Sequence, residues 1–141
     1  MTVPDLVEPF VGWKGLLASA RGVLVSPRGD VWTPNQPMVA DRKPSAANGN
    51  GIYAVIDFES LKKNAYNWRA ETEVLGEKHV WVIAEVALWG DVRKGAIGYR
   101  AEYAYPKRVY VPAQQLLLGR VIRDRYGCAL ARIDRFTGRR S

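Results

Sequence analysis

The amino-acid sequence predicts an α+β fold in which strands dominate, with mainly antiparallel sheets and about two helices. Three observations support this class. Residues 79–92 form a long apolar stretch with the two-residue period of a strand, several shorter strand-like segments are separated by turn residues, and only two stretches show helical periodicity. With 141 residues, 48% of them hydrophobic and 25% charged, the chain has the composition of a folded globule. We expect one domain over residues 13–127, with an extended lead-in over 1–12 and a basic tail over 128–141.

The first third of the domain is expected to consist of short strands joined by turns. Residues 13–34 contain turn signals at 20–22 and 26–30, where Gly supplies positive φ angles and Pro presets the turn. These signals predict a β-meander. Residues 34–50 collect Pro, Asn and Gly, which resist regular structure, and this predicted loop is long enough to have a role of its own.

The middle of the chain predicts a strand, a helix and the central strand of the sheet. Residues 51–56 form a short apolar segment, and Asp57 is a suitable N-cap for a helix over 58–69. The apolar face of that helix would consist of Phe58, Leu61, Ala65 and Trp68. Residues 79–92 are apolar on both faces, which is typical of a strand covered on both sides.

The last elements are two more strands and a helix. Residues 99–105 and 107–111 have strand composition and are separated by Pro106, which lacks a backbone donor. Residues 114–126 have helical periodicity, and Gly127 is a suitable terminator because Gly adopts the left-handed conformation of a C-cap.

Positive charge is concentrated at the C-terminal end. The formal net charge is +7, and residues 103–141 alone hold nine Lys and Arg against two Asp and Glu. Such a cluster attracts polyanions. One hypothesis is therefore a non-catalytic basic binding protein whose partner is nucleic acid, an acidic protein or a protein of a host. The contact residues would be Arg120, Arg123, Arg125, Arg132, Arg135, Arg139 and Arg140. The simpler interpretation is that these arginines keep a surface helix and a tail soluble.

Several classes of site are excluded by composition. Cys128 is the single cysteine and His79 the single histidine, so neither an intramolecular disulfide nor a multi-histidine metal site can form, and no metal is expected. No apolar run is long enough for a membrane span, and we expect a cytoplasmic protein. We interpret His79 as a solvated surface residue and Cys128 as a small packed side chain. Glu85, among apolar residues, should either pair with an Arg or lie at the edge of a cleft.

Three segments, GIYAVIDFESLKKNAY (51–66), AEVALWGDV (84–92) and AEYAYPKRVYV (101–111), occur in an order and spacing that resembles the ADP-ribosyltransferase superfamily, especially its poly(ADP-ribose) polymerase-like branch. The resemblance implies an ADP-ribosyltransferase-like fold and an NAD-dependent enzyme that transfers ADP-ribose to an unknown macromolecular acceptor. GIYA and GYRAEYAYP are also similar to segments of uncharacterised small proteins of actinobacteria and their phages, which implies no function.

The resemblance also implies roles for individual residues. Tyr53 and Tyr66 would lie against the nicotinamide ring, with Gly51 in the same cofactor-binding segment. Glu102 would be the catalytic carboxylate, stabilising the positive charge that develops as the glycosidic bond breaks. Lys14 would contact a phosphate or ribose oxygen in the WKG segment, where the branch has a His-Gly-Thr strand. The alternatives are that Glu102 is a cross-strand partner of a basic residue and that the tyrosines only pack.

Overall fold

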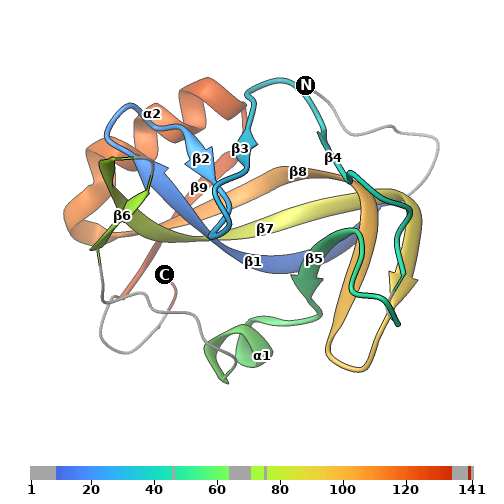
Figure 1. Ribbon diagram of the computed structural model, residues 1–141. Coiled ribbons are helices and arrows are strands. Elements are labelled where there is room, and N and C mark those ends of the chain that lie inside the picture. Colours follow the sequence, from blue (N-terminus) through green and yellow to red (C-terminus); the bar gives the residue numbers. More distant parts are fainter. Residues whose placement is uncertain (1–8, 46, 64–70, 75, 135–139, 141) are drawn as a thin grey trace.

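The computed structural model describes residues 9–45, 47–63, 71–74, 76–134 and 140, and it shows a strand-rich α+β fold (Figure 1). Its strands belong to one nine-stranded sheet. The elements in chain order are β1 (Phe10–Ser19), β2 (Leu24–Val25), β3 (Val31–Trp32), β4 (Met38–Val39), β5 (Ile52–Val55), α1 (Phe58–Lys63), β6 (Glu71–Val74), β7 (Glu77–Lys94), β8 (Gly98–Pro112), a 3-10 turn (Ala113–Gln115), α2 (Leu116–Tyr126) and β9 (Ala129–Ile133).

The sheet is curled until it nearly closes on itself. Strand β7 pairs with β1 along one edge and with β8 along the other, and β8 pairs in turn with β5. Strand β5 then meets β1 again through a single pairing, Trp13 with Val55. The circuit β1–β7–β8–β5 is therefore closed by one contact. Two register shifts between β7 and β8 supply the bends that this curvature needs.

Strand β8 is longer than the sequence predicts, because Pro106 does not interrupt it. The register shift in the β7–β8 ladder falls beside this proline: Glu85 pairs with Arg108 and Val86 with Pro106. Lys107 is the extra residue of this bulge. Because the ladder is already irregular there, the missing N–H of Pro106 costs few strand hydrogen bonds. The two predicted strands 99–105 and 107–111 are thus one.

Two predicted boundaries also differ from the structure. Residues 129–133, expected in the basic tail, form β9, which pairs in parallel with β8 and buries Ile133. At the other end, β1 begins at Phe10, inside the expected lead-in. Of the helix expected over 58–69, the described residues include α1, and the remainder lies outside the part of the chain that the structure describes.

The two faces of the sheet carry separate apolar clusters. The inner face buries alternate residues of β7, such as Val82 and Val86, against α2. The outer face buries Ile83 and Tyr110 with α1. In Figure 1 the two helices lie on opposite sides of the sheet. The prediction that residues 79–92 form a central strand covered on both faces is confirmed.

The end of α2 is tied to the β2–β3 hairpin. The hydroxyl of Tyr126 accepts a hydrogen bond from Leu24 N at 2.8 Å and donates one to the carbonyl oxygen of Trp32 at 2.5 Å. Gly127 follows in the left-handed conformation, with φ 65°, and its N–H closes the helix on Arg123 O. The predicted helix end is confirmed. The hairpin held in this way forms one wall of the candidate site.

His79 and Cys128 are both buried. His79 is 3% exposed, so the prediction of a solvated residue is wrong. Its neighbours on both sides are strands, with Ser19 of β1 and Thr72 of β6 in register, and neither pairing is visible in the local sequence. Cys128 is packed, as expected, and burial raises the pKa of its thiol to about 11. None of the helices in the described residues is long and apolar enough to cross a bilayer.

Candidate functional site

The candidate site is a cavity of about 510 Å³ at the place where β1 and β5 separate. These strands pair only at Trp13 and Val55, so beyond that point their facing edges are unpaired. The walls come from β1, the β2–β3 turn, β4 with the residues after it, the start of β5, and one residue of β8. Segments far apart in the sequence meet here because the sheet has curled.

Lys14 joins the two sides of this opening. Alternation along β1 places it on the inner face with Leu16 and Ala18, which belong to the buried core. Its Nζ donates a hydrogen bond to the carbonyl oxygen of Tyr53 at 2.7 Å. Burial is the main cause that lowers the pKa of this amine from 10.5 to about 8, and the positive charges of Arg100 and Arg28 lower it further. Lys14 is therefore a cation in an environment that disfavours positive charge.

Arg100 lies over the ring of Tyr53, its partner in the β5–β8 ladder. The guanidinium carbon is 4.3 Å from the ring centroid, a cation–π contact. Gly98 makes room for the ring, because a Cβ at that position would lie 2.7 Å from Tyr53 Cε2. The arrangement covers one face of Tyr53 with a guanidinium, and the ring packs on the outer apolar cluster that includes Val55 and Phe58.

Gly51 shapes the entry to β5. Its φ is +101°, and a Cβ there would approach Pro44 Cβ at 3.1 Å and Arg100 Cβ at 3.2 Å. A residue with a side chain would be strained in backbone conformation and would crowd Arg100. Gly51 therefore lets β5 pass close to β8 at the cavity wall.

The β2–β3 turn forms the opposite wall and is closed by its own hydrogen bonds. Ser26 N donates to Asp30 O at 2.8 Å, and Asp30 N donates to Ser26 Oγ at 3.1 Å. Arg28 and Asp30 thereby stand at the cavity on a fixed turn. Trp32, 2% exposed, also lines the cavity, and within the described residues its indole N–H has no hydrogen-bond partner.

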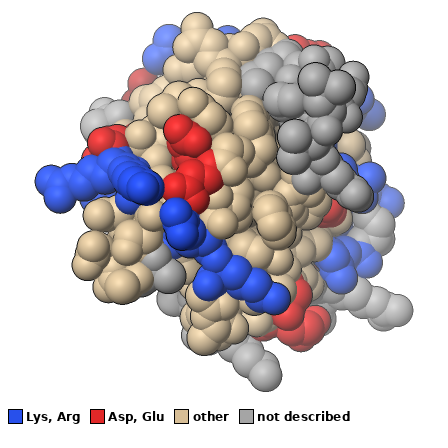
Figure 2. Space-filling view, turned by 90° about the vertical axis from the view of Figure 1, so that its right-hand side faces the viewer, with Lys and Arg blue, Asp and Glu red and all other residues tan. Residues whose placement is uncertain are grey.

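The charges that line the cavity do not balance. Lys14, Arg28 and Arg100 are cationic, whereas Asp30 and Asp41 are the acidic residues of the lining. In Figure 2, which views the molecule from the side of the β7–β8 turn, acidic groups interrupt the basic side chains rather than leaving one continuous basic surface. The cavity thus combines a small positive excess with apolar walls.

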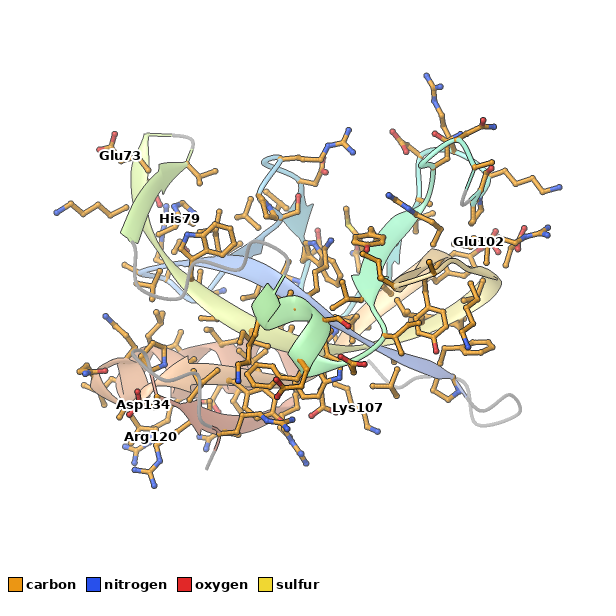
Figure 3. The ribbon with its side chains drawn as sticks, turned by 90° about the horizontal axis from the view of Figure 1, so that it is seen from below. Glu73, His79, Glu102, Lys107, Arg120 and Asp134 are labelled. Atoms are coloured by element: carbon orange, nitrogen blue, oxygen red, sulfur yellow. The ribbon has the colours of Figure 1, made fainter. Side chains whose placement is uncertain are left out.

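Three of the residues expected at an NAD site come together here, and one lies elsewhere. Lys14, Gly51 and Tyr53 all line the cavity. Glu102 is not in the lining, and its Oε1 accepts a hydrogen bond from Asp91 N at 3.0 Å, at the second bulge of the β7–β8 ladder. Figure 3 shows Glu102 at the opposite end of the molecule from Arg120. Tyr66 lies outside the described residues.

The basic residues near the C-terminus have varied surroundings. Arg125 Nε donates to Arg21 O at 2.6 Å, and Arg123 pairs with Asp124 at 3.1 Å. The Arg140 guanidinium lies over the Phe58 ring at 4.5 Å and the Trp13 ring at 5.1 Å. Three members of the expected contact set thus already have protein partners. Arg120 and Arg132 are exposed, and Arg135 and Arg139 fall in the part of the chain that is not described.

Glu85 is paired, one of the two arrangements expected for it. The Tyr110 hydroxyl donates to Glu85 Oε1 at 2.6 Å, and Arg108 Nη1 lies 3.7 Å from the same oxygen. Burial and the bond to this carboxylate raise the pKa of Tyr110. The group forms part of the outer face and is separate from the cavity lining.

Sequence reasoning missed Arg28, Arg100, Asp30 and Trp32. Strand alternation places Arg100 on the same face of its strand as Glu102. Because Glu102 is not in the lining, this local pattern does not assign Arg100 to the cavity. No family model, no curated protein and no solved structure matches this chain.

Proposed function

We propose that this chain binds a phosphorylated small molecule, of the nucleotide type, in the cavity between β1 and β5. The observation that carries the proposal is the position of Lys14, a partly buried amine whose nearest charged influences are two guanidiniums and a single carboxylate. An anion placed between Arg28 and Arg100 would offset the repulsion that these two cations exert on Lys14. Guanidinium groups also suit phosphate, because they offer paired donors in a plane.

The size and walls of the cavity favour a ligand with an organic part as well as a phosphate. A volume of about 510 Å³ falls in the range of small-molecule sites. Met38 and the exposed Val39 supply apolar surface, and Arg100 supplies a planar guanidinium. A nucleobase or another planar group would gain contact area there.

NAD, the substrate implied by the resemblance, is a member of this ligand class. Transfer of its ADP-ribose group would require a carboxylate beside the nicotinamide ribose. The carboxylates of the lining are Asp30 and Asp41, whereas that of Glu102 is bonded at the bulge. We therefore propose ligand binding and not ADP-ribose transfer. Transfer is tested separately, by measuring release of nicotinamide from NAD by the wild type and by Glu102→Gln.

The test is calorimetric titration with NAD, ADP-ribose, AMP and inorganic phosphate. Arg100→Gln should weaken binding of the phosphorylated ligands about ten- to a hundredfold, since charged hydrogen bonds contribute about 1.5–3 kcal/mol. Arg120→Gln, an exposed arginine of α2 outside the cavity, is the matched control and should bind like the wild type. Absence of binding at millimolar ligand, or equal losses in the two variants, would refute the proposal.

A further inference from the structure

We propose that Lys14 is a nucleophile that forms an iminium with the aldehyde or ketone group of a phosphorylated ligand held in the cavity. The inference rests on the proposed function, because the phosphate must be bound before the carbonyl group can be presented to the amine. It narrows the ligand class to carbonyl compounds with a phosphate, such as the open-chain form of a sugar phosphate.

The first support is the placement of the amine. Lys14 stands on β1, which pairs with β7 along its whole length, so the base of the side chain is fixed. One N–H of the amine is bound to the Tyr53 carbonyl. In the neutral amine this bond uses an N–H and not the lone pair, and Lys14 is among the residues that line the cavity. A nucleophile needs this combination of fixed position and accessible lone pair.

The second support is the charge around the amine. Arg100 and Arg28 oppose its protonation, Asp30 favours it, and Asp41 is the other carboxylate of the lining. With a pKa lowered to about 8, far more of the Lys14 amine is neutral near neutral pH than of an ordinary surface lysine, whose pKa is about 10.4. Desolvation and neighbouring cations are the usual means by which a lysine is made nucleophilic.

The two guanidiniums and the amine contact different groups of the ligand. A phosphate carries about two negative charges, which Arg28 and Arg100 can neutralise between them. Lys14 is then left for the uncharged carbonyl group of the same ligand. An anion that paired directly with Lys14 would raise the pKa of the amine and keep it protonated. With the phosphate on the two guanidiniums, burial, the largest of the causes, remains to keep the pKa of Lys14 low.

The reaction balances without an oxidant or reductant. The lone pair of Nζ attacks the carbonyl carbon, the π electrons of the C=O bond move to oxygen, and a proton passes from nitrogen to that oxygen to give a carbinolamine. Protonation and departure of the hydroxyl as water, followed by formation of the C=N bond, give the iminium. Asp30 and Asp41 are the lining carboxylates that can hold the transferred proton. The iminium nitrogen keeps one N–H, which can remain on the Tyr53 carbonyl.

The experiment compares two aldehydes that differ in phosphate. The full-length protein is incubated at pH 7.5 with pyridoxal 5′-phosphate or with pyridoxal and reduced with borohydride, and the adduct on each lysine is measured by peptide mass spectrometry. Lys43, exposed and lining a more open hollow beside this cavity, is the internal control. We expect Lys14 to be modified at least tenfold faster than Lys43 by the phosphorylated aldehyde. The preference of Lys14 for that aldehyde should exceed the preference shown by Lys43 in the wild type, and this excess should disappear in Arg100→Gln.

Two results would overturn the inference: modification of Lys14 no faster than that of Lys43, or the same preference for the phosphorylated aldehyde at both lysines. Calorimetry with AMP and inorganic phosphate separates this failure from that of the proposed function. Phosphate binding without a Lys14 adduct would refute the nucleophile and leave the binding site in place. Absence of both phosphate binding and the Lys14 adduct would refute the proposed function and the nucleophile. Lys14→Arg should lose the adduct at this position while Lys43 is still modified, which checks that the peptide assignment is correct.

Discussion

Replacing Lys14 by Met tests whether the cavity holds an unfavourable positive charge. The amine has a pKa of about 8 in the folded protein and 10.5 as its ordinary value. Below pH 8 it is protonated in both the folded and unfolded states, and folding bears the full cost of placing the charge in the cavity. Between pH 8 and 10.5 the unfolded state binds more protons, so this group makes the wild type more stable as pH rises.

The magnitude follows from the same two values. A depression of this size corresponds to about 3 kcal/mol at about 1.4 kcal/mol for each pH unit. Because the side chain keeps some contact with solvent, screening reduces the change, and we expect about 2 kcal/mol. Met has an unbranched chain that can line the same wall and takes up no proton. It also loses the hydrogen bond to Tyr53 O, which costs about 1 kcal/mol at every pH.

The assay is urea unfolding of both proteins at pH 7, 8, 9 and 10. The quantity to compare is the difference in free energy of unfolding, because other groups that titrate in this range cancel between the two proteins. The free energy of unfolding of the wild type should increase relative to that of Lys14→Met as the pH rises. Parallel pH profiles would refute the reasoning, and a relative loss by the wild type would show that Lys14 pairs with a carboxylate. Lys43→Met, at an exposed position, is the matched control variant.

Three further substitutions test the β2–β3 hairpin, the second β7–β8 bulge and the Tyr53–Arg100 contact. Tyr126→Phe leaves Leu24 N without its buried acceptor and should lower the free energy of unfolding by about 1–3 kcal/mol in urea titrations. Gly90→Ala would bring a Cβ within 2.5 Å of Glu102 Oε1 at φ +78°. It should lower the thermal midpoint more than Gly29→Ala, where φ is +98° and nothing lies within 4 Å of the added Cβ. Gly98→Ala would press on the Tyr53 ring and should weaken phosphate-ligand binding in calorimetry.

The parts of the fold that the sequence predicted depend on local signals. Strand β7 was recognisable because apolar residues occupy both of its faces, and the end of α2 because Gly127 follows directly on the helical pattern. The parts that it missed depend on distant neighbours. Strand β9 exists because it pairs with β8, and His79 is buried because β1 and β6 flank it. Short segments carry too little periodicity to predict such pairings.

The candidate site also combines residues that local sequence signals indicated with residues that distant parts of the chain bring to it. Lys14, Gly51 and Tyr53 were expected together from a resemblance in motif order, and they do line one cavity. Arg28 was not expected because it reaches the cavity only through the β2–β3 turn, which Tyr126 holds from the far end of the chain. Arg100 was not expected to contact Tyr53 because strand alternation says which face a residue occupies, not which strand lies beside it.

The chemical identity of Lys14 is the strongest reason to look for chemistry in this cavity. The curled sheet closes through one pairing between β1 and β5, so the Tyr53 carbonyl needs a donor from across the gap, and Lys14 supplies it. A neutral amide could make the same bond without placing a positive charge beside Arg28 and Arg100. A purely structural role thus leaves about 2 kcal/mol of electrostatic cost unexplained. A local cost of this kind is expected where a group is needed for its reactivity or its charge, and a ligand carrying a phosphate and a carbonyl would use both.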